Sequence, residues 1–203
     1  MSTTATSPTL RGMENRDAQD FALRIAPLAA AIANFCDHVE HNETADRAWV
    51  LDAATALRTL TGELCDREGL PLVDLYAERL GAIEARNVLA APGAFDGHGA
   101  AIEARTWREL QLVQAEHDRH YHQDVVGLAK NEQLRHYALH LAKVVGAFAT
   151  PDDPEDLLRR RLPDAILFAL KLSTVMGVRL SDDPLPGRTA TPQAVAASSG
   201  SRS

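Results

Sequence analysis

Residues 159–180 read RRRLPDAILFALKLSTVMGVRL, and the residues before them mark the start of a helix. Asp153 is a suitable N-cap, and Pro154 suits the first helical turn, where a missing N–H costs nothing. Glu155 and Asp156 add negative charge at the positive end of the helix dipole. The apolar positions then recur at helical spacing up to Gly177; they are Leu158, Leu162, Ile166, Leu170 and Leu172.

The same periodicity predicts five earlier helices, at about 18–41, 45–67, 71–88, 100–122 and 131–149. Pro27 predicts a kink or a restart in the first of them, and residues 91–99 have the composition of a loop. Alanine and leucine supply 34 and 26 of the 203 residues and aromatics only 5%, which favours helices over strands. We therefore expect an all-α protein, a six-helix bundle.

The two ends of the chain differ from its centre in composition. Residues 1–17 are rich in Ser and Thr, and residues 182–203 are rich in Pro, Gly and Ser without periodic apolar positions. Both are predicted to be disordered tails. Residues 18–181 are predicted to form a single helical domain, which is large enough to bury a core without disulfides.

The formal net charge of −7 argues against nucleic acid or an anionic membrane as a partner. Residues 130–180 differ from the rest, with eight Lys/Arg and six Asp/Glu. Charges interrupt every apolar stretch before it could cross a membrane, and the first residues do not resemble a secretory signal. Cys36 and Cys65 do not have the spacing of metal ligands and are expected to be reduced thiols. Because reduced thiols are typical of the cytoplasm, we expect a cytoplasmic protein.

A polar strip accompanies the apolar face of the helix predicted at 131–149. His136, His140, Lys143 and Ala147 are spaced so that they align along the helix, beside an apolar face centred on Leu134, Leu141, Val145 and Phe148. Two imidazoles and an ammonium in one row can line a pocket. The strip can equally be a solvated flank of the helix.

Two segments resemble the MazG-type all-α nucleoside triphosphate pyrophosphohydrolases. They are LHLAKVVGAFA (139–149) and RRRLPDAILFALKLSTVMGVRL (159–180), so the resemblance is confined to about residues 131–180. In that family two adjacent glutamates, a further glutamate and an E-x-x-D motif hold Mg²⁺, a hard cation that needs several oxygen ligands. The resemblance also implies a homodimer or a higher oligomer.

Most of the implied metal ligands are missing from this sequence. Lys143 and Val144 stand at the paired glutamates, Ala147 at the next glutamate and Arg161 at the glutamate of the second motif. Only Asp164 is retained. One carboxylate cannot assemble a Mg²⁺ site, and two cations there would repel the metal. We therefore expect no Mg²⁺ cofactor.

The replacement of acids by bases predicts a different function, which is to bind an anion without catalysis. Arg and Lys donors suit phosphates and carboxylates. The expected ligand is a phosphorylated metabolite or a protein partner, bound in a cationic cleft. The alternative is a vestigial cleft in which Arg161 pairs with Asp164 or Glu155. The candidate binding residues are His136, His140, Lys143, Arg161, Asp164 and Lys171.

Two enzymatic alternatives use the same residues. Arg135 and His140 fit an R-x4-H pattern that resembles the signature of HEPN-type ribonucleases, which implies cleavage of RNA without a metal. An altered nucleotide pyrophosphohydrolase is the other alternative.

A weaker hypothesis concerns a transition metal. Five of the eight histidines lie between residues 117 and 140. Glu116 with His120, and His136 with His140, are i, i+4 pairs that could grip a metal between neighbouring helices. His117 falls among apolar positions and is predicted to be a satisfied core histidine.

Overall fold

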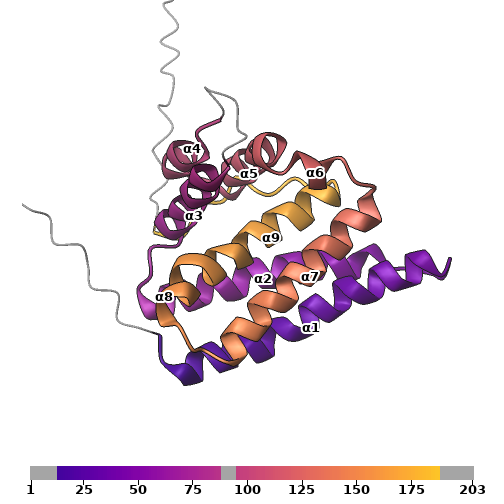
Figure 1. The fold of residues 1–203 in the computed structure, drawn as a ribbon, viewed down its shortest axis with the longest axis horizontal. Coiled ribbons are helices and arrows are strands. Elements are labelled where there is room, and N and C mark those ends of the chain that lie inside the picture. Colours follow the sequence, from indigo (N-terminus) through magenta and orange to yellow (C-terminus); the bar gives the residue numbers. More distant parts are fainter. Residues whose placement is uncertain (1–12, 88–94, 188–203) are drawn as a thin grey trace, which may run out of the picture.

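The computed structural model describes residues 13–87 and 95–187, and every element in this part of the chain is a helix or a turn apart from one isolated bridge (Figure 1). The elements are α1 (Asn15–Glu40), α2 (Arg47–Glu68), α3 (Leu72–Arg86), α4 (Gly97–Glu103), α5 (Trp107–Tyr121), α6 (Gln123–Val126), α7 (Lys130–Ala149), α8 (Pro154–Asp156), the π-helical turn η1 (Leu157–Arg161) and α9 (Leu162–Val175). The all-α prediction is confirmed. None of the helices in these two ranges has the length and apolarity that crossing a bilayer requires.

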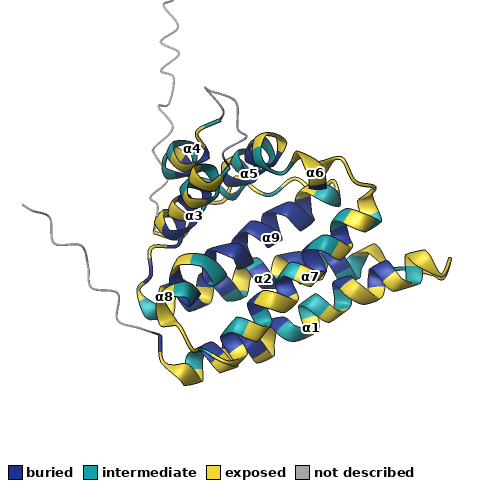
Figure 2. Cartoon of the chain, viewed as in Figure 1, coloured by how far each residue is buried: buried dark blue, intermediate teal, exposed yellow. Residues whose placement is uncertain are grey.

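Helix α9 is the centre of the molecule. It packs against α2, α3, α5 and α7, and every residue from Leu162 to Ser173 is buried (Figure 2). A helix that is apolar all round is stable only when other helices cover it on all sides. Figure 1 shows that arrangement, with α3 and α5 on one side of α9, α7 on the other, and α1 beyond α7.

The predicted count of six helices does not match the structure. The helix expected at 100–122 is two helices, because Thr106 and Glu109 form a capping box that starts α5 anew. The short helix α6 occupies the predicted connector before α7. Conversely, α1 runs from Asn15 to Glu40 without a restart at Pro27.

The last predicted helix begins as expected and then changes its winding. The side chain of Asp153 accepts hydrogen bonds from the backbone N–H groups of Glu155 and Asp156, which confirms the predicted cap. The five residues of η1 then form a π-helical turn before α9. Pro163 has no N–H with which to continue an α-helical ladder, which accounts for the wider turn at this position.

Part of each predicted tail is ordered in the structure. Helix α1 already includes residues 15–17. At the other end, residues 182–187 pack against the start of α5, where Leu185 is buried and its N–H donates to the carbonyl of Arg105 at 2.9 Å. A single leucine between two prolines has no apolar periodicity, so the sequence did not predict this contact. Residues 1–12 and 188–203 lie outside the described residues.

We predict that Leu170→Ala lowers the free energy of unfolding by about 2–5 kcal/mol, because it leaves a cavity beside a fully buried residue of α9. The measurement is urea unfolding followed by circular dichroism. The control is Leu112→Ala on α5, where the side chain is 61% exposed and the change should stay within about 0.5 kcal/mol. Equal losses in the two variants would contradict the central position of α9.

Candidate functional site: a buried polar cluster beside an imidazole pair

Two charged residues of α9 lie inside the protein, and each has a partner of opposite charge on another helix. Asp164 accepts from Arg79 of α3 at 2.7 Å. Lys171 lies 2.8 Å from Oδ1 of Asp118 of α5, and both side chains are more than nine-tenths buried. Each pair meets the requirement that a charge removed from water be compensated. Asp164 and Lys171 therefore both form ion pairs inside the protein, and they lie seven residues apart along α9.

The Lys171–Asp118 pair belongs to a wider buried cluster. Asp118 also accepts from the side-chain amide of Gln114 at 2.9 Å, and the carbonyl oxygen of that amide accepts from the hydroxyl of Tyr76 at 2.6 Å. The ammonium of Lys171 lies over the ring of Tyr137, 5.7 Å from its centroid. Burial raises the pKa of Asp118, and the neighbouring ammonium of Lys171 opposes that rise. Lys171 was among the residues expected to bind an anion, whereas Asp118 was not.

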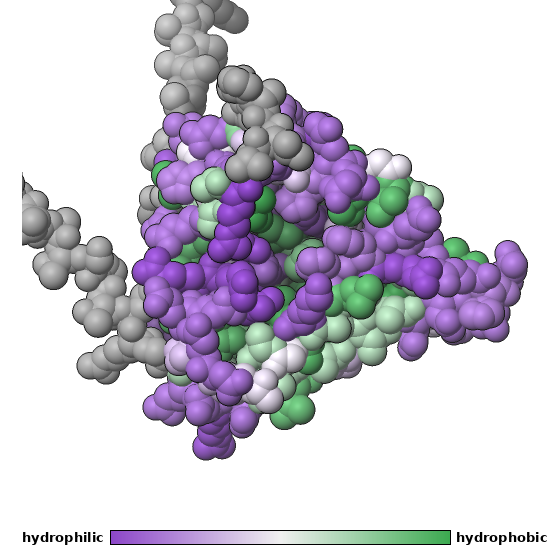
Figure 3. Space-filling model, viewed as in Figure 1, coloured by the Kyte–Doolittle hydropathy of each residue, from purple (hydrophilic) through white to green (hydrophobic). Residues whose placement is uncertain are grey.

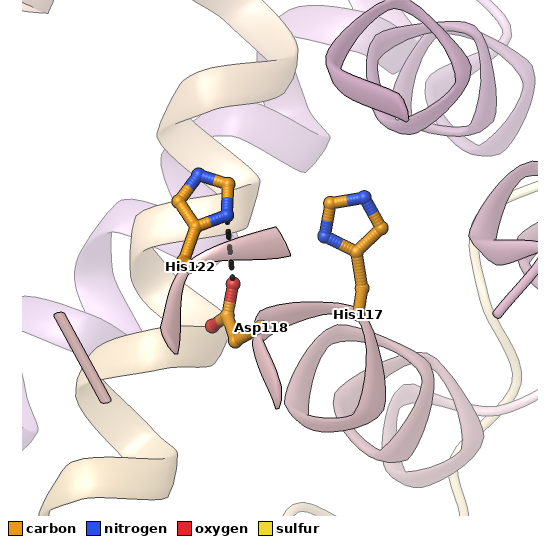
Figure 4. Close-up of side chains that lie close together, drawn as sticks. All are labelled: His117, Asp118 and His122. Atoms are coloured by element: carbon orange, nitrogen blue, oxygen red, sulfur yellow. Dashed lines mark ion pairs between the residues drawn. The ribbon is translucent and has the colours of Figure 1, made fainter. Parts of the chain in front are cut away.

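Two histidines complete this cluster, which we call the buried polar cluster: His117, Asp118, His122 and Lys171. His117 is fully buried, yet neither of its ring nitrogens has a hydrogen-bond partner among the described residues. Nδ1 of His122 is also without one, and it lies 3.8 Å from Oδ1 of Asp118 (Figure 4). The prediction that His117 belongs to the core is correct, but its polar atoms are only partly satisfied, since Nε2 lies 3.5 Å from Oε1 of Glu84 without the geometry of a hydrogen bond.

The electrostatics of the cluster keep its histidines neutral. Burial, reinforced by the positive charge of Lys171, lowers the pKa of His117 to about 4 and that of His122 to about 3. A neutral imidazole has one nitrogen that accepts, which is the form that binds a metal or accepts a proton.

The predicted polar strip of α7 lies beside this cluster. The rings of His136 and His140 are 4.5 Å apart, and the ring of His140 lies 5.4 Å from that of Phe168 on α9. Both imidazoles are half-buried. Burial lowers the pKa of His140 to about 4, helped by the positive charges of His136, Lys143, Lys171 and Arg161.

The far end of the strip forms one wall of a groove of about 410 Å³ between α7 and η1. Lys143, Ala147 and Arg161 line it together with Asp152, Asp153 and Asp156. Arg161 donates to Asp156 at 3.0 Å, so its partner is neither Asp164 nor Glu155. Lys143 is exposed and forms no ion pair within residues 13–87 and 95–187. Val144 differs from the other three residues at the implied metal positions because it is part of the core.

The residues expected to bind an anion therefore fall into two groups. His136, His140 and Lys143 follow one another along the face of α7, with Arg161 near enough to influence His140. Asp164 and Lys171 are occupied by Arg79 and Asp118. The spacing along a single helix predicted the first group, whereas the ion pairs depend on which helices pack against α9.

The residues expected for a ribonuclease site share no described contact with one another, and neither do the two histidine pairs expected for a metal site. Arg135 pairs with Glu40 of α1 at 2.7 Å, whereas His140 lies against α9, and no described contact joins the two. Glu116 contacts His120 at 3.2 Å on the exposed side of α5 and does not meet His136 or His140 in any described contact. The histidine pairs thus do not form the expected metal site.

No family model matches this chain, and neither a curated protein nor a solved structure shows significant similarity to it.

We predict that acid destabilises the protein as the pH falls from about 6.5 to about 4, the interval between the ordinary histidine pKa and the lowered values in the fold. In this pH interval each such histidine is protonated in the unfolded chain but stays neutral in the folded chain. The free energy of unfolding therefore falls by about 1.4 kcal/mol per pH unit for each of them. Chemical denaturation at several pH values measures this slope.

The test variant is His122→Asn, which cannot titrate and should reduce the slope by about one proton. The matched control is the same substitution at His41, which is exposed at the end of α1 and so reports the effect of replacing a histidine away from the cluster. A wild-type slope of zero across this interval would show that these histidines do not titrate abnormally.

Proposed function

We propose that the protein binds an anionic small molecule of the phosphate or carboxylate class at His136, His140 and Lys143, without catalysing its conversion. The observation that supports this most directly is the imidazole pair with rings 4.5 Å apart, half-buried among positive charges. Imidazole and ammonium N–H groups are suitable donors to such oxygens, and charge-assisted bonds of this kind are about twice as strong as neutral ones.

The charges around the pair support an anion as the ligand. Burial lowers the pKa of His136, the positive charges of Lys171 and Lys143 lower it further, and Asp124 of α6 acts in the opposite direction. Of the two lysines, Lys171 is already neutralised by Asp118, so Lys143 supplies the accessible charge. A bound anion would reverse the effect on the imidazoles, and binding would then take up protons.

The MazG-like character belongs to this proposal. The resemblance placed the acidic, metal-binding face of that family at Lys143, Val144, Ala147 and Arg161. We propose that this chain keeps the helical framework and binds the phosphorylated ligand through cations in place of Mg²⁺.

We also propose that two copies associate through α1 and α7. Alanines make up half of the residues that line a groove of about 580 Å³ between these helices, and Leu139, which also lines it, is 65% exposed. In Figure 3 apolar atoms gather where α1 and α7 lie. The lining also includes Asp37, Glu40 and Arg135, of which Glu40 and Arg135 pair with each other at 2.7 Å, so the groove offers a second copy a mainly apolar face with few unpaired charges.

The proposed location is the cytoplasm. Cys36 and Cys65 are both free and buried, and burial raises their pKa values to about 11 and about 12, which keeps the thiols protonated and unreactive. Unpaired thiols of this kind suit a reducing compartment.

We expect calorimetric titration with inorganic phosphate and a panel of nucleotides to show a ligand that binds more tightly as the pH is lowered toward the imidazole pKa values. Lys143→Glu should weaken binding by about tenfold or more, since one charge-assisted contact is worth about 1.5–3 kcal/mol.

The matched control is Lys130→Glu, the same change of charge at the exposed first residue of the same helix, about 20 Å away along its axis. It should bind like the wild type. If both substitutions weakened binding equally, the effect would come from the net charge of the protein and not from a contact at Lys143. If no ligand of the panel bound, the small-molecule proposal would be wrong.

For the association of two copies, we expect sedimentation equilibrium to give the mass of a dimer for the wild type and of a single chain for Ala142→Glu. Ala142 is exposed and lines the groove, so a buried carboxylate there would have no partner. Ala85→Glu, at an exposed alanine of α3, is the control and should stay dimeric. A monomeric wild type would refute the interface.

A further inference from the structure

The C-terminal end of α5 gathers three potential metal ligands that the polar strip of α7 does not include. His117 and Asp118 are adjacent near the end of the helix, and His122 is the first residue after it. One ligand atom from each lies within 4.8 Å of the other two. Figure 4 shows both imidazole rings directed toward the space around the Asp118 carboxylate.

The hydrogen bonding of these residues is incomplete in a way that points to a ligand. His117 is fully buried, and its Nδ1 and Nε2 have no hydrogen-bond partner among the described residues. The same holds for Nδ1 of His122. Buried polar atoms are nearly always paired because an unpaired one keeps the cost of leaving water. A bound cation would account for Nδ1 of His117 and Nδ1 of His122, whereas Nε2 of His117 lies 3.5 Å from Oε1 of Glu84.

The orientation of His117 also fits a metal ligand. Its Nε2 lies 3.5 Å from Oε1 of Glu84, and that oxygen is itself fixed by the backbone N–H groups of Gly97 at 2.9 Å and His98 at 3.2 Å. Nδ1 is the nitrogen left to face Asp118 and His122 (Figure 4). Histidine ligands commonly direct their second nitrogen at a carboxylate, which fixes the ring and strengthens the ligand.

Lys171 defines how a cation would be bound. Its ammonium contacts Oδ1 of Asp118 at 2.8 Å, and the Gln114 amide donates to the same oxygen. Oδ1 also lies 3.8 Å from Nδ1 of His122, so a metal bound there would compete with the Lys171 ammonium, which would weaken its affinity. Two nitrogens and one oxygen suit zinc and similar divalent transition metals, whereas Mg²⁺ and Ca²⁺ require mainly oxygen.

We propose that His117, Asp118 and His122 form a binding site for a divalent transition metal of the zinc class, with Glu84 as the residue that positions His117. Three protein ligands leave a coordination position open for water or another small ligand. This site does not depend on the proposed anion site, because it uses none of His136, His140 or Lys143.

The test uses Co²⁺ as a spectroscopic probe and Zn²⁺ as its competitor, with the full chain purified without a histidine tag. We expect one equivalent of Co²⁺ to give the visible absorption of a four- or five-coordinate site, abolished by Zn²⁺ and accompanied by a rise in Tm. His122→Asn and His117→Asn should each lose the absorption. Glu84→Gln should weaken binding by about 10-fold to 100-fold.

The control is His120→Asn, an exposed histidine of the same helix that also belonged to the set Glu116, His120, His136 and His140. It should bind Co²⁺ as tightly as the wild type. Circular dichroism of the metal-free variants separates loss of a ligand from loss of the fold, and His122, at the surface end of the cluster, is the substitution that should fold normally.

Failure of the wild type to bind Co²⁺, or retention of the absorption by folded His122→Asn, would overturn the proposal. Loss of binding in His120→Asn instead would assign the metal to the exposed histidines. Phosphate titration of Lys143→Glu is measured separately, so either proposal can fail without the other.

Discussion

The interaction on which the structure depends is the enclosure of α9, a helix buried on every side although it carries two opposite charges. Four other helices pack against it. Asp164 forms an ion pair with Arg79 of α3, and Lys171 forms one with Asp118 of α5. Buried charges are tolerated only when they are paired and hydrogen-bonded. The two pairs therefore fix which residues of α3 and α5 face α9.

The buried polar cluster follows from this constraint. Lys171 pairs with Asp118 inside the protein, the adjacent His117 is buried as well, and His122, four residues after Asp118, lies 3.8 Å from the same carboxylate. Adjacent cations and burial then keep both imidazoles neutral, as they keep His140 neutral on α7. Lys171 acts on the imidazoles of both proposed sites, since its positive charge lowers the pKa of His117 and His122 as well as that of His136 and His140.

Part of the arrangement could be predicted from single helices. The alignment of His136, His140 and Lys143 depends only on the repeat of α7, and the imidazole pair is present as that repeat requires. The cap at Asp153 is equally local. Asp118 and His122 are four residues apart, a spacing that aligns them on a helix, so the sequence offered a signal for this pair. What it did not indicate is that this side of α5 is buried against Lys171 of α9.

Periodicity and composition were enough to predict that this protein is helical, where most of its helices lie, and which polar residues align along α7. Those properties depend on interactions within a few turns of one helix. The tertiary structure alone decided that Arg161 pairs with Asp156, that Asp164 and Lys171 are neutralised by other helices, and that two unpaired histidines flank Asp118. These outcomes depend on the choice of packing partner and on the cost of burying charge, which no periodicity along one segment records.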